Sequence, residues 1–296
     1  MSDAVSTRAS GQVTLREATP EDAGACARIL FEAFGAIHDQ HRFPRDFPTP
    51  EAATAMMGTW IPHPSVWGVV AERDGRIVGS NFLDERNPIR GVGPITVAPD
   101  GQSSGVGRKL MEAVIERGGD APGIRLLQDS FNMSSLSLYR SLGFLVKEPV
   151  AMASGQPRSR PPDGVEVRSL RAEDLGGCEA LCERVHGFAR TKEVEDALRA
   201  LACFVALRDG RVTAYATSVS FWAANHGVAE TEEDMKALLL GAAASMDEPL
   251  GLLIPLRSGL LGWCLDEGLR LVKPMNLMAL GEYQGPRGSW FPSVLY

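Results

Sequence analysis

The chain has 296 residues, which is long enough for two domains of ordinary size. Hydrophobic residues make up 44% of it and charged residues 23%, a composition typical of a globular protein with real apolar cores. The net charge of -7 gives no electrostatic reason to expect nucleic-acid or anionic-membrane binding, and no stretch approaches the roughly 20 apolar residues of a membrane-spanning helix.

The five cysteines are odd in number, and none of them forms a Cys-x-x-Cys pair. This pattern favours reduced, buried thiols over disulfides or a zinc site. The first residues, 1–11, are polar and lack the apolar run of a secretion signal. We therefore expect a cytoplasmic protein.

The first 83 residues alternate between apolar runs typical of strands and patterns typical of helices. The predicted elements, in order, are a strand at 13–16, a helix that begins at Pro20, a helix over 50–61, and strands at 66–72 and 76–83. Arg73-Asp-Gly75, between the last two strands, is a hairpin signal. The segment 38–48, which separates the two helices, is too rich in proline for regular structure.

A glycine-rich turn follows the end of an apolar strand at 93–97. The turn reads Gln102-Ser-Ser-Gly105-Val-Gly107, and apolar residues recur after it at helical spacing. Unpaired backbone N–H groups at the start of such a helix, together with the helix dipole, make a pocket for an anion such as a pyrophosphate. Arg108, just inside the helix, adds positive charge there.

Two other phosphate-binding loops fail on spacing. Counted from Gly101, a Walker A loop needs its second glycine at Val106 and its lysine at Gly107. A dinucleotide fingerprint begins at Gly105-Val-Gly107 but meets Leu110 where its third glycine belongs. Two interpretations remain, namely a simple strand–helix turn and a Gln/Arg-x-x-Gly-x-Gly/Ala loop that follows Val-x-Pro.

The second interpretation resembles the acyl-CoA loop of the GNAT superfamily of N-acetyltransferases. The elements after the loop helix are a strand at 124–128, a helix over 134–142 and a strand that begins at 143–146. Asn132-x2-Ser135-x3-Tyr139-x3-Gly143-Phe144 is similar to the Asn-x2-Ala-x3-Tyr-x3-Gly-Phe signature that closes the GNAT fold, with Ser for Ala. Two motifs in the right order make residues 12–153 similar to that fold. A buried packing role for Tyr139 stays open beside a catalytic one.

The second half of the chain resembles a diverged copy of the first. A proline- and arginine-rich linker at 154–164 separates domains at 1–153 and 165–296. Phe204-Val-Ala-Leu-Arg-Asp-Gly-Arg211 echoes Val69-Val-Ala-Glu-Arg-Asp-Gly-Arg76, which argues for duplication. The predicted fold class is therefore α+β (α/β), with two tandem GNAT-like domains, each a mixed, mostly antiparallel sheet flanked by helices.

The second copy lacks the features that the first one keeps. No Gln-x-x-Gly-x-Gly motif occurs in its corresponding segment, 221–250. The helix near Thr231 opens with three acids, Glu232-Glu-Asp234, which would repel a pyrophosphate. Cys264 and Arg257 stand where the first copy has Tyr139 and Asn132. We expect a degenerate domain that does not bind CoA. Its expected role is to form a wall of the substrate cleft, to dimerise or to complete the sheet.

The resemblance implies which residues hold acetyl-CoA. The pantetheine arm would pair with the backbone of one strand, Ile95, Thr96 and Val97. The pyrophosphate would lie on the turn and the first turn of its helix, at Gln102, Ser103, Ser104, Gly105, Val106, Gly107 and Arg108. Asn132 would contact the CoA arm.

The resemblance also implies a reaction. The Val97 N–H would polarise the thioester carbonyl, and Tyr139 would protonate the departing thiolate, since a neutral phenol with a pKa of about 10 suits that task. The expected function is acetyl-CoA-dependent N-acetyl transfer to a primary amine of a small molecule or peptide by direct attack. The alternative is a non-catalytic acyl-CoA-binding or sensing protein. A homodimer is the commonest assembly for such folds.

The sequence leaves the proton acceptor open. Three carboxylates lie at strand ends and could relay a proton through water, namely Asp84, Glu85 and Asp129. Three histidines lie in or near the segment expected to form the acceptor wall, His38, His41 and His63. The first two are three residues apart, but no third ligand with convincing spacing accompanies them, so we expect no metal.

Overall fold

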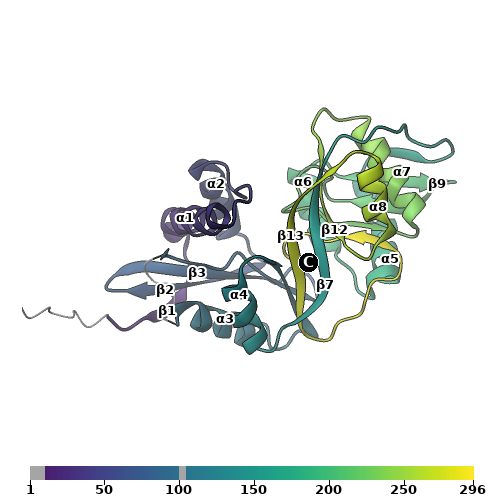
Figure 1. Ribbon diagram of the computed structural model, residues 1–296. Helices are drawn as coiled ribbons and strands as arrows, with labels where there is room; N and C mark the ends of the chain where they lie inside the picture. Colours follow the sequence, from purple (N-terminus) through teal and green to yellow (C-terminus); the bar gives the residue numbers. More distant parts are fainter. Residues whose placement is uncertain (1–10, 100–104) are drawn as a thin grey trace, which may run out of the picture.

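The structure is a computed structural model that describes residues 11–99 and 105–296 (Figure 1). The first half contains β1 (Thr14–Glu17), a short 3-10 helix (Pro20–Asp22), α1 (Ala23–His41), α2 (Pro50–Trp60), β2 (Val66–Arg73), β3 (Arg76–Asp84), β4 (Arg90–Val92), β5 (Thr96–Val97), α3 (Val106–Arg117), β6 (Gly123–Asp129), α4 (Met133–Ser141) and β7 (Leu145–Gly155). These elements follow the predicted order.

The second half repeats much of that order. It contains β8 (Glu166–Ser169), a 3-10 helix (Ala172–Asp174), α5 (Leu175–His186), α6 (Thr191–Ala200), β9 (Phe204–Arg208), β10 (Arg211–Ala216), β11 (Gly227–Ala229), α7 (Glu232–Ala243), β12 (Leu250–Pro255), α8 (Gly259–Asp266), β13 (Arg270–Gly281) and β14 (Ser289–Phe291). Residues 156–165 join the halves outside any helix or strand. The domain boundary at 154–164 stays a prediction.

Three predicted elements differ from the structure. The segment 38–48 is not irregular throughout, because α1 continues to His41 and ends at Arg42 in the left-handed region (φ 61). The strand expected at 93–97 is divided into β4 and β5. The C-terminal residues 290–296 are typical of a final strand, but β14 ends at Phe291 and residues 292–296 lie outside any strand.

The duplication is visible in local geometry. The β2–β3 hairpin turns at Asp74 (φ 51) and Gly75 (φ 71), and the β9–β10 hairpin turns at Asp209 (φ 49) and Gly210 (φ 74). Positive φ at both central residues is the turn that matches the twist of the paired strands. In the same way, an Arg16–Asp22 ion pair in the first half, at 2.7 and 2.9 Å, is repeated by Arg168 and Asp174 at the same two distances.

One sheet is shared between the two halves. Its strand order is β1-β2-β3-β4-β6-β13-β7-β12, and a second sheet has the order β14-β11-β10-β9-β8. Both are mostly antiparallel, as predicted, and β4 and β6 form the parallel pair. The long strand β13 of the second half lies between β6 and β7, while β7 lies between β13 and β12 (Figure 1). Backbone hydrogen bonds therefore join the halves.

Helices cover both faces of the first part of the shared sheet. Helices α1 and α2 lie on one face and α3 and α4 on the other (Figure 1). Under α1 and α2 the core contains Leu30, Met57 and Phe82, and under α3 and α4 it contains Leu110 and Phe144. These side chains are fully buried, so they fix the helices against the strands that carry the candidate site.

All five cysteines are buried and free, in agreement with the prediction of reduced thiols. Among the described residues, no helix combines the length and the apolar character needed to cross a membrane.

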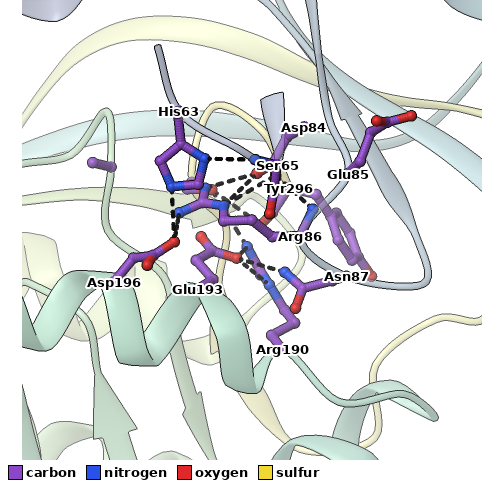
Figure 2. Close-up of polar contacts among 12 residues, drawn as sticks. His63, Ser65, Asp84, Glu85, Arg86, Asn87, Arg190, Glu193, Asp196 and Tyr296 are labelled. Carbon is purple, nitrogen blue, oxygen red and sulfur yellow. Dashed lines mark hydrogen bonds and ion pairs between the residues drawn. The ribbon is translucent and has the colours of Figure 1, made fainter. Parts of the chain in front are cut away.

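A buried polar network also joins the halves (Figure 2). Glu193, near the start of α6, accepts hydrogen bonds from the Arg190 guanidinium at 2.9 Å and from the Asn87 amide of the first half at 3.4 Å, and its other oxygen lies 3.2 Å from His226. Burial alone would raise the pKa of Glu193, but Arg190 and His226 hold that pKa well below its usual range.

Replacing Glu193 with Gln should lower the free energy of unfolding by about 3–5 kcal/mol, because the Arg190 guanidinium would be left buried without its counter-charge. Urea unfolding at neutral pH measures this loss. The matched control is Glu195→Gln, an exposed residue on the same helix, with an expected change within about 0.5 kcal/mol. Equal effects of the two variants would show that the network does not stabilise the fold.

Candidate functional site

The shared sheet opens between β5 and β6. The parallel pairing of β4 with β6 ends at Arg90↔Ile124 and Gly91↔Arg125. Beyond this point β5 pairs only with β3 among the described strands, while β6 continues alongside β13. The edge of β5 that faces β6 is therefore left without a strand partner.

The direction of the β5 backbone follows from its pairing with β3. The Ala98 N–H donates to the Val78 carbonyl at 2.9 Å. Since backbone groups of neighbouring residues point to opposite edges of a strand, the Val97 N–H points away from β3, toward the opening. Ile95 shares the orientation of Val97. Thr96 faces β3, and its hydroxyl lies 3.2 Å from that of Ser80.

Helix α3 begins beside this opening. Gly105 caps it in the left-handed region (φ 81), and the first-turn N–H groups of Val106, Gly107 and Arg108 have no acceptor within their own helix. A Cβ atom on Gly107 would lie 3.5 Å from Leu138 and 3.7 Å from Val97, so this turn contacts both α4 and β5. The predicted ligands Gln102, Ser103 and Ser104 lie outside the described residues.

The other predicted residues lie on α3 and at the start of and within α4, the two helices that meet near Gly107. Arg108 is exposed, and its guanidinium donates to the Ser141 hydroxyl at 2.6 Å. Asn132 caps α4, with its Oδ1 accepting from the Ser135 N–H at 3.1 Å, so a contact with a ligand would come from its Nδ2. Tyr139 is 7% exposed. Burial, together with the charge of Asp129, raises the pKa of Tyr139, so its hydroxyl stays protonated at neutral pH.

A buried cluster lies at the end of β6, where Asp129 meets side chains from three other segments. The Lys273 ammonium of β13 lies 2.9 Å from Asp129 Oδ1 and 2.6 Å from Asp46 Oδ1. His38 Nε2, on α1, lies 3.3 Å from Asp46 Oδ1 and 3.6 Å from Asp129 Oδ2. His38 Nδ1 donates to the Phe34 carbonyl at 2.8 Å, which orients the imidazole.

The cluster contains three groups able to bind a cation together, His38, Asp46 and Asp129. Sequence reasoning found no third ligand beside the histidines, and Asp46 and Asp129 are brought there by the fold. The Lys273 ammonium occupies the position between the two carboxylates, within 2.9 Å of each. It supplies the positive charge that two buried carboxylates require.

The remaining candidates for the proton acceptor have other partners. Asp84 accepts from Arg86 at 2.7 Å and Glu85 accepts from Arg117 at 3.0 Å. His63 lies 3.1 Å from Asp196 of the second half. His41 is exposed at the end of α1.

Sequence reasoning missed Lys273 and Asp46. The available signal for Lys273 was a lone charge within the apolar strand sequence Leu271-Val-Lys-Pro-Met275. The register explains its place, because Met275 pairs with Asp129 and Lys273, two residues before it, lies on the same face of β13. No local pattern singled out Asp46.

In the second half the corresponding opening is filled. β14 pairs with β11, with Gly227↔Phe291 and Ala229↔Ser289, and it also contacts β12. The first turn of α7 is occupied by its own acids, as the sequence predicted. Glu232 accepts from the Ser258 hydroxyl at 3.3 Å.

Comparison with known proteins finds a family profile that matches part of the first half. Residues 30–144 match the profile of the acetyltransferase (GNAT) family. Among curated proteins, the UPF0157 protein YqkA of Bacillus subtilis is 30% identical over 83 residues, which is 28% of this chain. This chain spans only 24% of the length of that relative.

Solved structures share the fold over both halves. A putative acetyltransferase from Pyrococcus horikoshii matches with a TM-score of 0.74 and 17% identity, over 96% of this chain and 94% of that one. A GCN5-related N-acetyltransferase from Sphaerobacter thermophilus gives 0.62 and 15%, over 92% and 96%. A tandem GNAT protein from the clavulanic acid biosynthesis pathway gives 0.57 and 11%, over 94% and 99%. These likenesses confirm the predicted fold class, a tandem GNAT fold.

Proposed function

From the match of residues 30–144 to the GNAT acetyltransferase family, we propose that the protein is an acetyl-CoA-dependent N-acetyltransferase. The first half binds acetyl-CoA and transfers the acetyl group to a primary amine by direct attack. The second half does not bind CoA.

The opening between β5 and β6 is the observation that carries this proposal. The Val97 N–H faces it, the first-turn amides of α3 lie at one end, and the protonated Tyr139 packs beside it. A thioester lying there would have a donor for its carbonyl oxygen, amides for its pyrophosphate and a proton for its sulfur.

The second half supports the proposal by contrast. Its corresponding opening holds β14, and its α7 presents Glu232, Glu233 and Asp234 in the first turn. Carboxylates at that position would repel a pyrophosphate, and the paired strand leaves no free edge for a pantetheine arm.

Each residue of the first half has a defined task in the reaction. The Val97 N–H stabilises the negative charge that develops on the carbonyl oxygen, which is worth about 10²–10³ in rate for one such donor. Tyr139 gives its proton to the departing sulfur. The amides of α3 hold the pyrophosphate, which fixes the distance between the thioester and both groups.

Thiol release tests the function. The purified protein is incubated with acetyl-CoA and a panel of primary amines that contains polyamines, amino sugars and short peptides with a free N-terminus or lysine. We expect release of CoA thiol that requires both substrates and yields the acetylated amine by mass spectrometry. Tight binding of acetyl-CoA with no amine-dependent release across the panel would instead support a non-catalytic acyl-CoA-binding protein.

We also propose a cytoplasmic location. Five free cysteines that are all buried fit a compartment that keeps thiols reduced.

A further inference from the structure

We propose that Asp129 accepts the proton of the attacking amine, and that Lys273, supplied by the second half of the chain, is the positioning residue that keeps Asp129 ionised. The inference rests on the proposed function and adds to it the identity of the base. It also gives the second half a part in the chemistry of the first.

Asp129 differs from the other buried carboxylates in its hydrogen bonding. Its side chain is only 10% exposed, and its polar contacts among the described residues are the Lys273 ammonium, 2.9 Å from Oδ1, and His38 Nε2, 3.6 Å from Oδ2. The other buried acids accept from an arginine guanidinium or from backbone N–H groups, and they are Asp22, Asp84, Glu148, Asp174, Glu193, Asp234 and Glu267. The charge of Asp129 therefore depends mainly on Lys273, since a buried carboxylate is costly without a partner of opposite charge.

The position of Asp129 suits a proton acceptor. It ends β6, at the edge of the opening, and its charge acts on Tyr139 on one side. His38, Asp46 and Lys273 surround it on the other side. Oδ1 is buried against Lys273, so Oδ2 is the oxygen that an amine can reach.

The basic side chains of the cluster, His38 and Lys273, are more deeply buried than its two carboxylates. The side chains of His38 and Lys273 are 0% and 1% exposed, whereas those of Asp46 and Asp129 keep 11% and 10%. Lys273 also lies over the Trp222 ring, 4.6 Å from its centroid, which fixes the ammonium from the side of the second half. An incoming ammonium therefore meets carboxylates first.

The charges around Asp129 explain why it needs Lys273. Burial and the neighbouring Asp46 raise the pKa of Asp129, and Lys273 opposes this rise. Burial also works against a charge on His38, but Asp46 outweighs burial and raises the pKa of that imidazole. Without Lys273, two carboxylates would share the site with one imidazole, and the pKa of Asp129 would rise further.

The step balances in atoms and charge. Asp129 Oδ2 takes one proton from the substrate ammonium and later passes it to water. The free amine forms a C–N bond with the acetyl carbon, and the C–S bond breaks. Tyr139 protonates the sulfur and regains a proton from the nitrogen of the new amide, so the products are the amide, CoA thiol and one proton.

The experiment uses the full chain, acetyl-CoA and the amine of the panel that is acetylated fastest. In Asp129→Asn we expect kcat to fall at least tenfold, with the dissociation constant for CoA within about twofold of wild type. Glu85→Gln, a rival base held by Arg117, should keep kcat within about twofold. Wild-type-like turnover of Asp129→Asn would overturn the inference.

The role of Lys273 is tested by the pH profile. In Lys273→Met the acidic limb of kcat/KM should move to higher pH by about one unit or more, and Lys273→Arg should move it back toward wild type. Lys147→Met, on the neighbouring strand β7, should leave the profile unchanged. A purely structural role would lower activity equally at every pH, which would contradict the assignment.

Two further results keep the outcome clear. If Lys273→Met fails to fold, the double variant Asp129→Asn/Lys273→Met replaces it, because it removes one charge of each sign. If Lys273 acts through Asp129, the double variant should be no less active than Asp129→Asn alone. A fall of tenfold or more below Asp129→Asn would overturn the inference. An inactive wild type would refute the proposed function itself, whereas an active wild type with an equally active Asp129→Asn would refute only the inference.

Discussion

Replacing Gly107 with Glu should abolish CoA binding, with a dissociation constant at least about 100-fold higher, which corresponds to about 2.7 kcal/mol. The new carboxylate would stand in the first turn of α3, where the proposed site holds a pyrophosphate, and like charges repel. Isothermal titration with CoA measures the loss.

The fold should tolerate this substitution. A Cβ atom at Gly107 would make ordinary contacts, at 3.5 and 3.7 Å, and Glu favours a helix more than Gly does. The matched control is Gly176→Glu, the second residue of α5 as Gly107 is of α3, with open space around it. We expect Gly176→Glu to bind CoA like wild type. Normal binding by Gly107→Glu would refute the pyrophosphate site.

Replacing Tyr139 with Phe should lower kcat by about 100-fold and leave the dissociation constant for CoA within about twofold, because the hydroxyl acts on the sulfur only as the C–S bond breaks. Steady-state thiol release and titration with CoA measure the two quantities. Within the described residues the Tyr139 hydroxyl makes no hydrogen bond, so the melting temperature should change little.

Tyr283→Phe is the matched control for that variant, since it removes a hydroxyl from a tyrosine that packs on Arg125 and has no part in the proposed site. Its turnover should equal that of wild type. Unchanged turnover of Tyr139→Phe would leave Tyr139 with only its packing role beside Phe144.

The comparison of both halves shows how much can be predicted from local sequence. The hairpin at Asp74-Gly75 and its copy at Asp209-Gly210 have the expected positive φ angles, because such turns depend on their own residues. The start of α7 at Thr231 was also predictable, since its side chain accepts from the Asp234 N–H as a helix cap does.

The candidate site was predictable only in part. The two motifs of the first half located β5, the start of α3, Asn132 and Tyr139, because these positions lie within about 50 residues of one another in one repeating unit. They did not indicate which edge of β5 is free. The Ala98–Val78 hydrogen bond decides that Val97 faces the opening while Thr96 does not.

The sequence by itself predicted the GNAT-like fold, the repeated order of elements and the absence of the acyl-CoA loop motif from the second copy, because each of these depends on short motifs and their spacing. Only the tertiary structure decided that β13 lies between β6 and β7, and that Lys273 meets Asp46 across 227 residues of chain. The placement of β13 depends on pairing between distant segments, which no local pattern encodes. This pairing brings the Lys273 ammonium of the second half into the candidate site of the first half.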